Sequence, residues 1–214
     1  MHTQKEKFSF KKWIENFWYY YKWHSIIAVI LIIGIIVGIS SCINRKKVDL
    51  CIYYFSYDPL AYNEDNINLH NALLPYVEDF DGDGTVRLEI QNYYVGDKSN
   101  SKDQISQFNT ELQGGSALLI LMDKTGMEQM VDTAYLGNII DIAPDATYDG
   151  RIWDASDSDF RNSPELKNWK ENMYFGLRVY DDKSIIHIIP GKDEQYEYAK
   201  RVLNNIIHNQ KVNV

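Results

Sequence analysis

One short run of the sequence has the composition and spacing of a calcium-binding loop. The run DFDGDG places Asp79, Asp81 and Asp83 at alternating positions, as in the first half of an EF-hand loop. Carboxylates in this pattern converge on one ion, and the glycines permit the sharp turn between them. Thr85 offers a backbone carbonyl, and Glu89 lies beside the position that needs a bidentate glutamate. We interpret these five residues as candidate ligands for Ca²⁺.

The same run also fits a simpler interpretation, which is a turn without metal. The position that should carry the bidentate glutamate is Ile90, and the chain is predicted to continue there as a strand. An EF-hand loop would instead lead into a helix. Aspartate and glycine are typical of a tight turn between a helix and a strand. A structural calcium site and a bare turn are therefore both open interpretations of this run.

A second acidic stretch, residues 143–162, is predicted to form a long solvated loop that could also hold a cation. Its aromatic residues are Tyr148, Trp153 and Phe160. Three rings in one loop form either a contact surface or a small core of their own. The sequence does not decide between these two roles.

Catalytic motifs are absent from the sequence. It contains no GxSxG, no HExxH and no glycine-rich loop that would cradle a phosphate. The histidines of the C-terminal part, His70, His187 and His208, are widely separated, and His187 alternates within a predicted strand. We therefore expect a protein that is not an enzyme and that needs no cofactor other than the candidate Ca²⁺.

The pattern of apolar residues predicts the elements that would position this loop. Apolar runs and alternation indicate strands, whereas steps of three and four residues indicate helices. The order is β-α-β-α-β-α-β-β-α, which predicts a single three-layer α/β domain with a mixed sheet and a central strand at 116–122. The final two strands should form a hairpin. The predicted elements are strands at 48–55, 86–91, 116–122, 173–179 and 184–190, and helices at 69–80, 105–112, 127–131 and 199–207.

A membrane-spanning helix is predicted ahead of this domain. Residues 25–44 form an uncharged, predominantly apolar stretch of twenty residues, which as a helix spans roughly 30 Å, the thickness of a bilayer's hydrocarbon core. Trp13, Trp18 and Trp23 precede it, and tryptophan prefers the headgroup level of a bilayer. The chain thus divides into a leader (1–24), a transmembrane helix (25–44) and a domain (45–214).

The anchor leaves three further questions open. The leader could form an amphipathic helix in the interface or an irregular aromatic belt. Gly34 and Gly38 form a GxxxG motif, which favours close packing of two spans and hence a homo-oligomer. Cys42 ends a run, ISSC, that is similar to a bacterial lipobox and makes it a candidate for lipidation after cleavage. An uncleaved span and a lipoprotein are the two alternatives.

Charge separates the anchor from the domain. Residues 1–47 carry eight basic and two acidic side chains, and residues 48–214 carry fourteen basic and twenty-eight acidic ones. The acidic domain excludes nucleic acid as a partner, because nucleic acid needs a basic footprint. Five basic residues precede the span and three follow it. This difference predicts a cytoplasmic N-terminus and an extracytoplasmic domain at the cell membrane.

Four segments carry a resemblance to known proteins: FWYYYKWHSI, VDLCIYYF, DFDGDGTVRLEI and QISQFNTELQGGSALLILMD. Together they resemble uncharacterised membrane-anchored proteins of Firmicutes, especially gut clostridia, whose activity is not established. Residues 104–142 also resemble part of one lobe of type 2 extracellular solute-binding proteins. Ala117 and Leu118 replace the Pro-Asp of that pattern, so no ligand contact carries over. Residues 48–214 suffice for one lobe, not for a hinged pair.

The function expected from these features is a non-enzymatic binding or interaction module anchored in the bilayer. Its partner would be an envelope protein or a small solute. The alternatives are a structural subunit of a membrane complex assembled through the transmembrane helix, a lipoprotein with a solute-binding-like lobe, and an envelope hydrolase with an unrecognised site. The two cysteines, Cys42 and Cys51, are not expected to form a disulfide.

Overall fold

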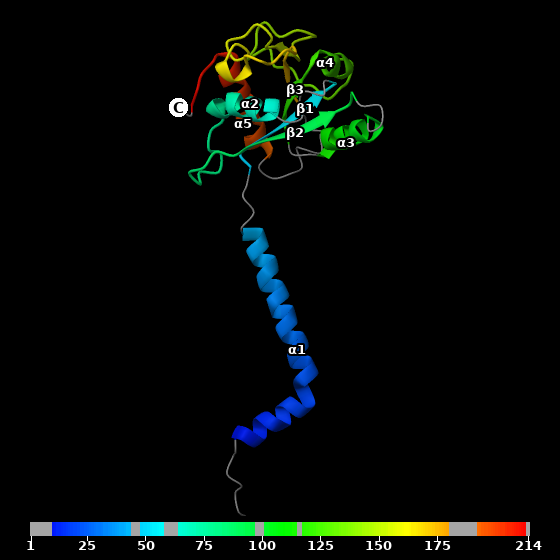
Figure 1. The fold of residues 1–214 in the computed structure, drawn as a ribbon, viewed down its shortest axis with the longest axis vertical. Coiled ribbons are helices and arrows are strands. Elements are labelled where there is room, and N and C mark those ends of the chain that lie inside the picture. Colours follow the sequence, from blue (N-terminus) through cyan, green and yellow to red (C-terminus); the bar gives the residue numbers. More distant parts are fainter. Residues whose placement is uncertain are drawn as a thin grey trace, which may run out of the picture. The chain divides into compact units, whose positions relative to one another are not determined.

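The chain divides into two compact units, residues 1–46 and residues 47–214. A computed structural model describes residues 10–43, 48–57, 64–96, 101–114, 117–179 and 192–212. The first unit contains one helix, and the second contains a mixed sheet with helices on both faces (Figure 1). A mixed α/β domain behind an N-terminal apolar helix is the fold class that the sequence predicts.

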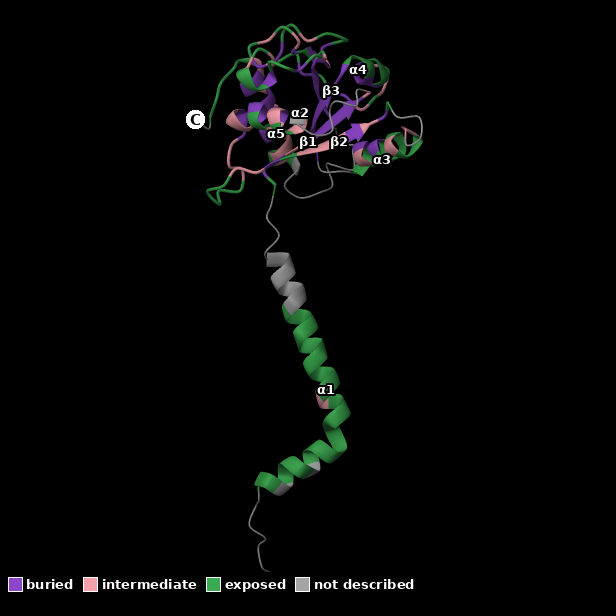
Figure 2. Ribbon diagram, viewed as in Figure 1, coloured by how far each residue is buried: buried purple, intermediate pink, exposed green. Residues whose placement is uncertain are grey.

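Helix α1 (Phe10–Ile43) is a single element of 34 residues that includes most of the leader and the apolar stretch. Four of its rings follow one face, because Phe10, Trp13, Phe17 and Tyr21 stack in succession with centroids 6.0, 5.7 and 5.3 Å apart. The large apolar side chains described along it are exposed (Figure 2). The stretch Phe17–Ile36 is long and apolar enough to cross a membrane, and it also suits a signal sequence.

The sheet of the second unit has the strand order β2-β1-β3-β5-β4. Parallel pairing joins the first three strands in this order, and antiparallel pairing joins the rest. The central strand β3 is buried along its whole length, which confirms the prediction for 116–122. The strands are β1 (Leu50–Ser56), β2 (Leu88–Tyr94), β3 (Leu119–Met122), β4 (Trp153–Asp154) and β5 (Tyr174–Leu177).

Two apolar cores, one on each face of the sheet, give the domain its three layers. Helices α2 (Glu64–Leu73) and α5 (Lys192–Ile207) cover one face through residues such as Leu69 and Val202. Helices α3 (Ser101–Gly114) and α4 (Lys124–Met130) cover the other face through residues such as Phe108 and Met127. The spacing of apolar residues along the sequence therefore predicts the buried faces of these helices.

The first helix of the domain ends earlier than its apolar spacing predicts. Helix α2 stops at Leu73, and a 3-10 turn, η2 (Leu74–Tyr76), follows with Pro75 in it. Proline disfavours helical backbone in the residue before it, so the α-helix cannot continue through this position. From Val77 the chain is extended and leads into the acidic loop. This early stop frees the loop to fold back toward β1.

Strand β5 pairs with β3 on one side and with β4 on the other. Strand β4 comes from the acidic stretch that was predicted to be a loop, and this corrects that part of the prediction. The hairpin partner predicted at 184–190, with His187, lies outside the described residues, so the hairpin stays a prediction. Trp153 and Phe160 are buried in the core, and Tyr148 is exposed. Two of the three rings therefore serve the core. A further 3-10 turn, η3 (Pro164–Leu166), lies between the two strands.

A buried polar network fastens α3 to the sheet. Arg178 is almost fully buried, and its Nη1 donates to the carbonyl of Glu111 at 2.8 Å. The hydroxyl of Tyr53, on β1, donates to Oε2 of the same glutamate at 2.9 Å. Burial lowers the pKa of Arg178 and raises the pKa of Tyr53 to about 12. Each group thus favours its neutral form more than it would in water.

The raised pKa of Tyr53 predicts a loss of stability at high pH. The unfolded tyrosine loses its proton near about pH 10, while the folded one keeps it until about pH 12. The contribution of Tyr53 to the free energy of unfolding is complete below about pH 10, and this contribution then falls by about 2 kcal/mol as the pH rises to about 12. Urea denaturation across this interval measures the fall. In Tyr53→Phe the fall should be smaller, and an equal fall in both proteins would contradict the assignment.

Candidate functional site

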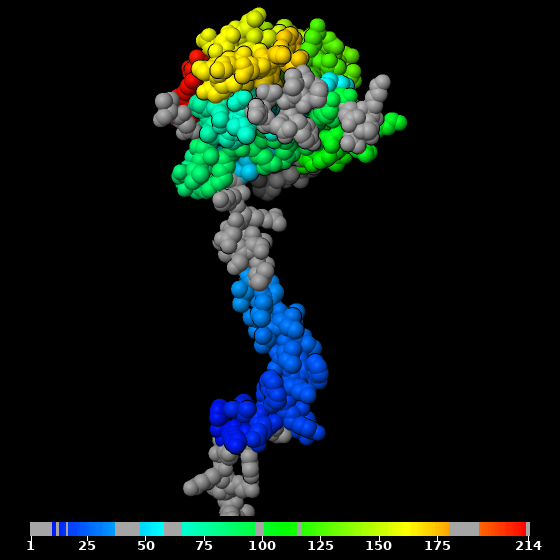
Figure 3. All heavy atoms as spheres, in the orientation of Figure 1, coloured from blue at the N-terminus to red at the C-terminus, as the bar shows by residue number. Residues whose placement is uncertain are grey.

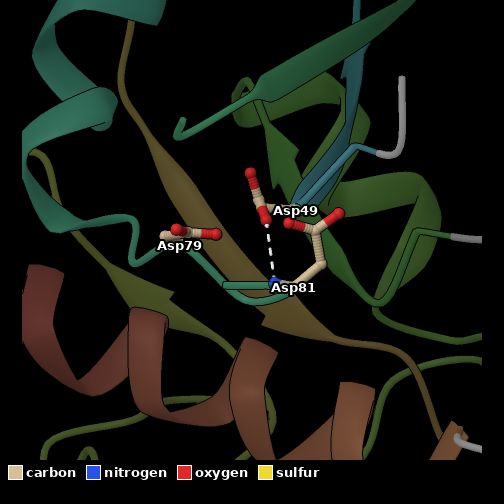
Figure 4. A group of neighbouring side chains, drawn as sticks. All are labelled: Asp49, Asp79 and Asp81. Carbon is tan, nitrogen blue, oxygen red and sulfur yellow. Dashed lines mark hydrogen bonds between the residues drawn. The ribbon is translucent and has the colours of Figure 1, made fainter. Parts of the chain in front are cut away.

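Three carboxylates meet where β1 begins. Asp49, Asp79 and Asp81 each offer an oxygen, and these oxygens lie within 4.8 Å of one another (Figure 4). Asp49 directly precedes β1, and the other two lie in the acidic loop between η2 and β2. In Figure 3 this loop lies at the surface of the domain, beside α2. These three residues could hold a metal ion, and we refer to them as the aspartate cluster.

Asp49 positions the loop. Its side chain is buried, and its Oδ1 accepts hydrogen bonds from the backbone N–H groups of Phe80 at 2.9 Å and Asp81 at 3.3 Å. Its Oδ2 accepts from the N–H of Arg87 at 2.7 Å. The backbone N–H of Asp49 also donates to the carbonyl of Arg87. One buried carboxylate therefore joins the start of β1 to both arms of the loop.

Asp79 closes the loop from inside. Its Oδ1 accepts from the N–H groups of Gly82 at 2.8 Å and Asp83 at 3.2 Å, and its Oδ2 accepts from Gly84 at 2.6 Å. Gly82 and Gly84 have φ angles of 72° and 83°, which side chains other than glycine rarely adopt. The turn that composition predicts is therefore present, and the same aspartates that shape it also belong to the cluster.

The remaining predicted ligands lie outside the cluster. Asp83 pairs with Arg87 through an Oδ2 to Nη1 distance of 2.6 Å, and this hydrogen bond lowers the pKa of the Asp83 carboxyl. The N–H of Thr85 donates to Oδ1 of Asp83 at 2.9 Å. Glu89 is exposed on β2, where its Oε1 accepts from Nε2 of Gln91 at 2.8 Å. The structure thus brings Asp79 and Asp81 together with a residue that the loop pattern does not include.

The sequence pattern does not point to Asp49 as a ligand, because the role of this residue depends on tertiary structure. It lies 30 residues before Asp79, and only the folding of the loop against β1 brings them together. The sequence offers one signal for this residue. Asp49 directly precedes the apolar run of β1, and a charged side chain is unusual next to residues that are expected to be buried. Buried carboxylates require hydrogen-bond donors, and the loop supplies three.

The chemistry of the cluster suits a hard cation. Its ligands are carboxylate oxygens, which Ca²⁺ and Mg²⁺ prefer, and it contains none of the nitrogen or sulfur donors that transition metals favour. The exposed side of the cluster leaves room for water as a further ligand, since Asp81 lies at the surface. Three negative charges held this close together gain strongly from a divalent cation between them.

A cavity of about 480 Å³ adjoins the cluster. Its wall includes two members of the cluster, Asp49 and Asp81, as well as Glu89 from β2. The lining also includes the apolar side chain of Leu118, which precedes β3, and Tyr198 of α5. The acidic site therefore continues into a pocket large enough for a small molecule.

The predicted anchor residues lie on α1. Trp13, Trp18 and Trp23 are exposed along this helix. Apart from its chain neighbours and the backbone of its own helix, Gly34 has no heavy atom within 4 Å of the position that a Cβ would take. Gly38 and Cys42 are helical in backbone, but their side-chain surroundings lie outside the described residues. The lipidation and GxxxG hypotheses therefore stay predictions.

Comparison of the chain with models of protein families, with curated proteins and with solved structures finds no match in any of the three. The resemblances to clostridial membrane-anchored proteins and to a solute-binding lobe therefore stay expectations.

Proposed function

We propose that this chain is a membrane-anchored, extracytoplasmic binding module without enzymatic activity, and that its aspartate cluster holds a calcium ion. The observation that carries the proposal is the pairing of two units in one chain. One unit is an apolar helix with exposed side chains, and the other is a domain with its own buried cores. Such a helix needs lipid around it.

The orientation of the anchor is tested by protease treatment of intact cells. The excess of lysine before the span supports a cytoplasmic N-terminus. Trypsin added to whole cells should then remove the domain, and an antibody against the C-terminus should lose its signal. Lysed cells serve as the positive control, and a cytoplasmic protein serves as the control for cell integrity. A domain that is protected in intact cells and cleaved after lysis would overturn the proposed location.

Calcium is proposed over other cations for two reasons. The group consists of carboxylates alone, and its loop has the spacing of calcium loops over Asp79, Asp81 and the two glycines. A bound ion would link β1 to the loop in addition to the three hydrogen bonds of Asp49. Its role would be structural, since it would fix the loop that forms one wall of the cavity.

A second candidate function is that of a structural subunit in a membrane complex. The GxxxG spacing of Gly34 and Gly38 on α1 favours it, because small residues permit two spans to pack closely. Crosslinking in membranes should then capture oligomers in the parent protein and far fewer in Gly34→Leu. A monomer in both proteins would leave the binding module as the sole proposal.

A further inference from the structure

Helix α1 is longer than a bilayer is thick. At 1.5 Å per residue, its 34 residues extend about 51 Å, whereas the hydrocarbon core of a bilayer measures about 30 Å. The apolar window Phe17–Ile36 contains Lys22, but residues 23–43 contain no lysine, arginine, aspartate or glutamate. These uncharged residues cover about 31 Å and can cross the core without a buried charge. Residues 10–22, which we call the leader helix, are then left outside the core.

The leader helix carries a continuous stripe of exposed rings. Phe10, Trp13, Phe17 and Tyr21 stack in succession, and each of them is exposed. Their spacing of three and four residues places them on one side of the helix. Among the described residues, none covers this stripe. A contiguous apolar surface of this kind marks a contact with a membrane or a protein, because its exposure to water is unfavourable.

The charged residues lie on a different side of the leader helix. At about 100° per residue, Lys11, Glu15 and Lys22 fall within one narrow sector, about 135° from the middle of the ring stripe. All three side chains are exposed. The leader helix has three lysines against one glutamate, so it is basic as a whole. Rings on one side and lysines on the other are typical of helices that lie in the membrane interface.

The cover that lies nearest to the stripe is the bilayer itself. The leader helix continues without a break into residues 23–43 of the same α-helix, so insertion of these residues holds its last turn at the level of the headgroups. Figure 1 also shows a bend within α1, after its first turns. Such a bend permits the leader helix to run along the membrane while the rest of α1 crosses it. A protein partner would need a separate encounter, whereas lipid is present wherever the span is inserted.

We propose that the leader helix lies in the plane of the membrane, with its ring stripe at the boundary between headgroups and acyl chains. The inference rests on the proposed membrane anchor and adds a second contact with the same bilayer. Tryptophan and tyrosine rings favour this depth, because they combine an apolar body with a polar tip. Lys11 and Lys22 then reach the negatively charged lipid phosphates from the other side of the helix.

Tryptophan fluorescence of the full-length protein in lipid nanodiscs tests the inference. The nanodiscs contain phosphatidylcholine and phosphatidylglycerol, with or without bromine on the acyl chains, which quenches only nearby tryptophan. Iodide quenches from the water on both sides of the disc. The background protein carries Trp13→Phe, Trp18→Phe and Trp23→Phe. The two remaining tryptophans, Trp153 and Trp169, are buried in the domain, and their signal is subtracted.

Two probes on opposite faces of the leader helix are compared in this background. Phe17→Trp places a probe on the ring stripe, and Tyr19→Trp places one about 160° away and only about 3 Å further along the helix axis. We expect bromolipid quenching at position 17 to exceed that at position 19 about threefold, with the reverse order for iodide, because the apolar face of an interfacial helix is buried about 5 to 10 Å deep. Ile33→Trp, on the exposed surface of the span, is the control for contact with acyl chains.

The outcomes separate this inference from the proposed anchor. An upright leader helix would hold both probes at nearly the same depth, so equal quenching at positions 17 and 19 would overturn the inference and leave the anchor intact. Protection of position 17 from bromolipid and iodide alike would mean that a protein surface covers the stripe, and would also overturn the inference. A protein that does not co-elute with the nanodiscs would overturn the anchor and the inference together.

Discussion

Replacement of Asp49 by alanine is expected to lower the free energy of unfolding of the domain by about 3 kcal/mol. The carboxylate is buried and accepts three backbone hydrogen bonds, from Phe80, Asp81 and Arg87. Each hydrogen bond to a charged group contributes about 1.5 to 3 kcal/mol, and some of the freed N–H groups would find water at the loop surface. The effect should therefore be large and less than the sum of three such bonds.

Urea denaturation of the full-length protein in nanodiscs, followed by tryptophan fluorescence, measures this change. Trp153 and Trp169 are buried in the domain and report its unfolding. Asp145→Ala is the matched control, because Asp145 is exposed and belongs to neither the cluster nor the cavity. Its effect should stay within about 0.5 kcal/mol. A similar small change in Asp49→Ala would show that the loop does not depend on this carboxylate.

Two arginines in the middle of the apolar helix should detach the protein from the membrane. Ile30 and Ile33 are exposed on α1 and lie within the stretch that is long enough to span a bilayer. Each arginine at the centre of a span costs about 2.5 to 3.5 kcal/mol, so the pair should cost about 5 to 7 kcal/mol. We expect the parent protein in the membrane pellet after alkaline extraction and the double variant in the supernatant.

The matched control for this variant is Ile30→Leu with Ile33→Leu, which keeps the apolar character and should stay in the pellet. The mass of the protein recovered from membranes adds a second readout. An uncleaved anchor gives the full 25.0 kDa. Cleavage before Cys42 would give a shorter, lipid-modified protein and would replace the anchor with a lipoprotein tether. Solubility of the parent protein after extraction would contradict both forms of anchoring.

The order of strands and helices was predictable because local patterns determine most of it. Continuous apolar runs predict β1 and β3, and an apolar stripe predicts α5. No other type of element fits these three segments as well. Strand β4 was not predictable in this way. It has only two residues, Trp153 and Asp154, and it forms because β5 offers an edge to which it pairs. Such a strand depends on a distant partner and leaves no periodic signal of its own.

The site shows the same division between local and tertiary information. The alternate spacing of Asp79, Asp81 and Asp83 predicts a loop whose carboxylates converge, and the structure brings the first two together. The pattern does not show that Asp83 turns to Arg87, because that pairing depends on how the loop leaves for β2. Nor does it include Asp49, which reaches the loop only in the folded domain. The spacing of the aspartates therefore predicts the loop, whereas the packing of the loop against β1 determines which carboxylates lie close together.

Calorimetric titration of Ca²⁺ into the full-length protein tests the central claim, which is that the aspartate cluster holds a calcium ion. We expect one binding event with a Kd between about 10⁻⁴ and 10⁻³ M, as in extracellular calcium modules. Asp79→Asn and Asp81→Asn should each abolish the heat, while Asp83→Asn should retain it, because Asp83 pairs with Arg87 outside the cluster. No heat with the parent protein, or a loss in Asp83→Asn equal to that in Asp81→Asn, would contradict the account.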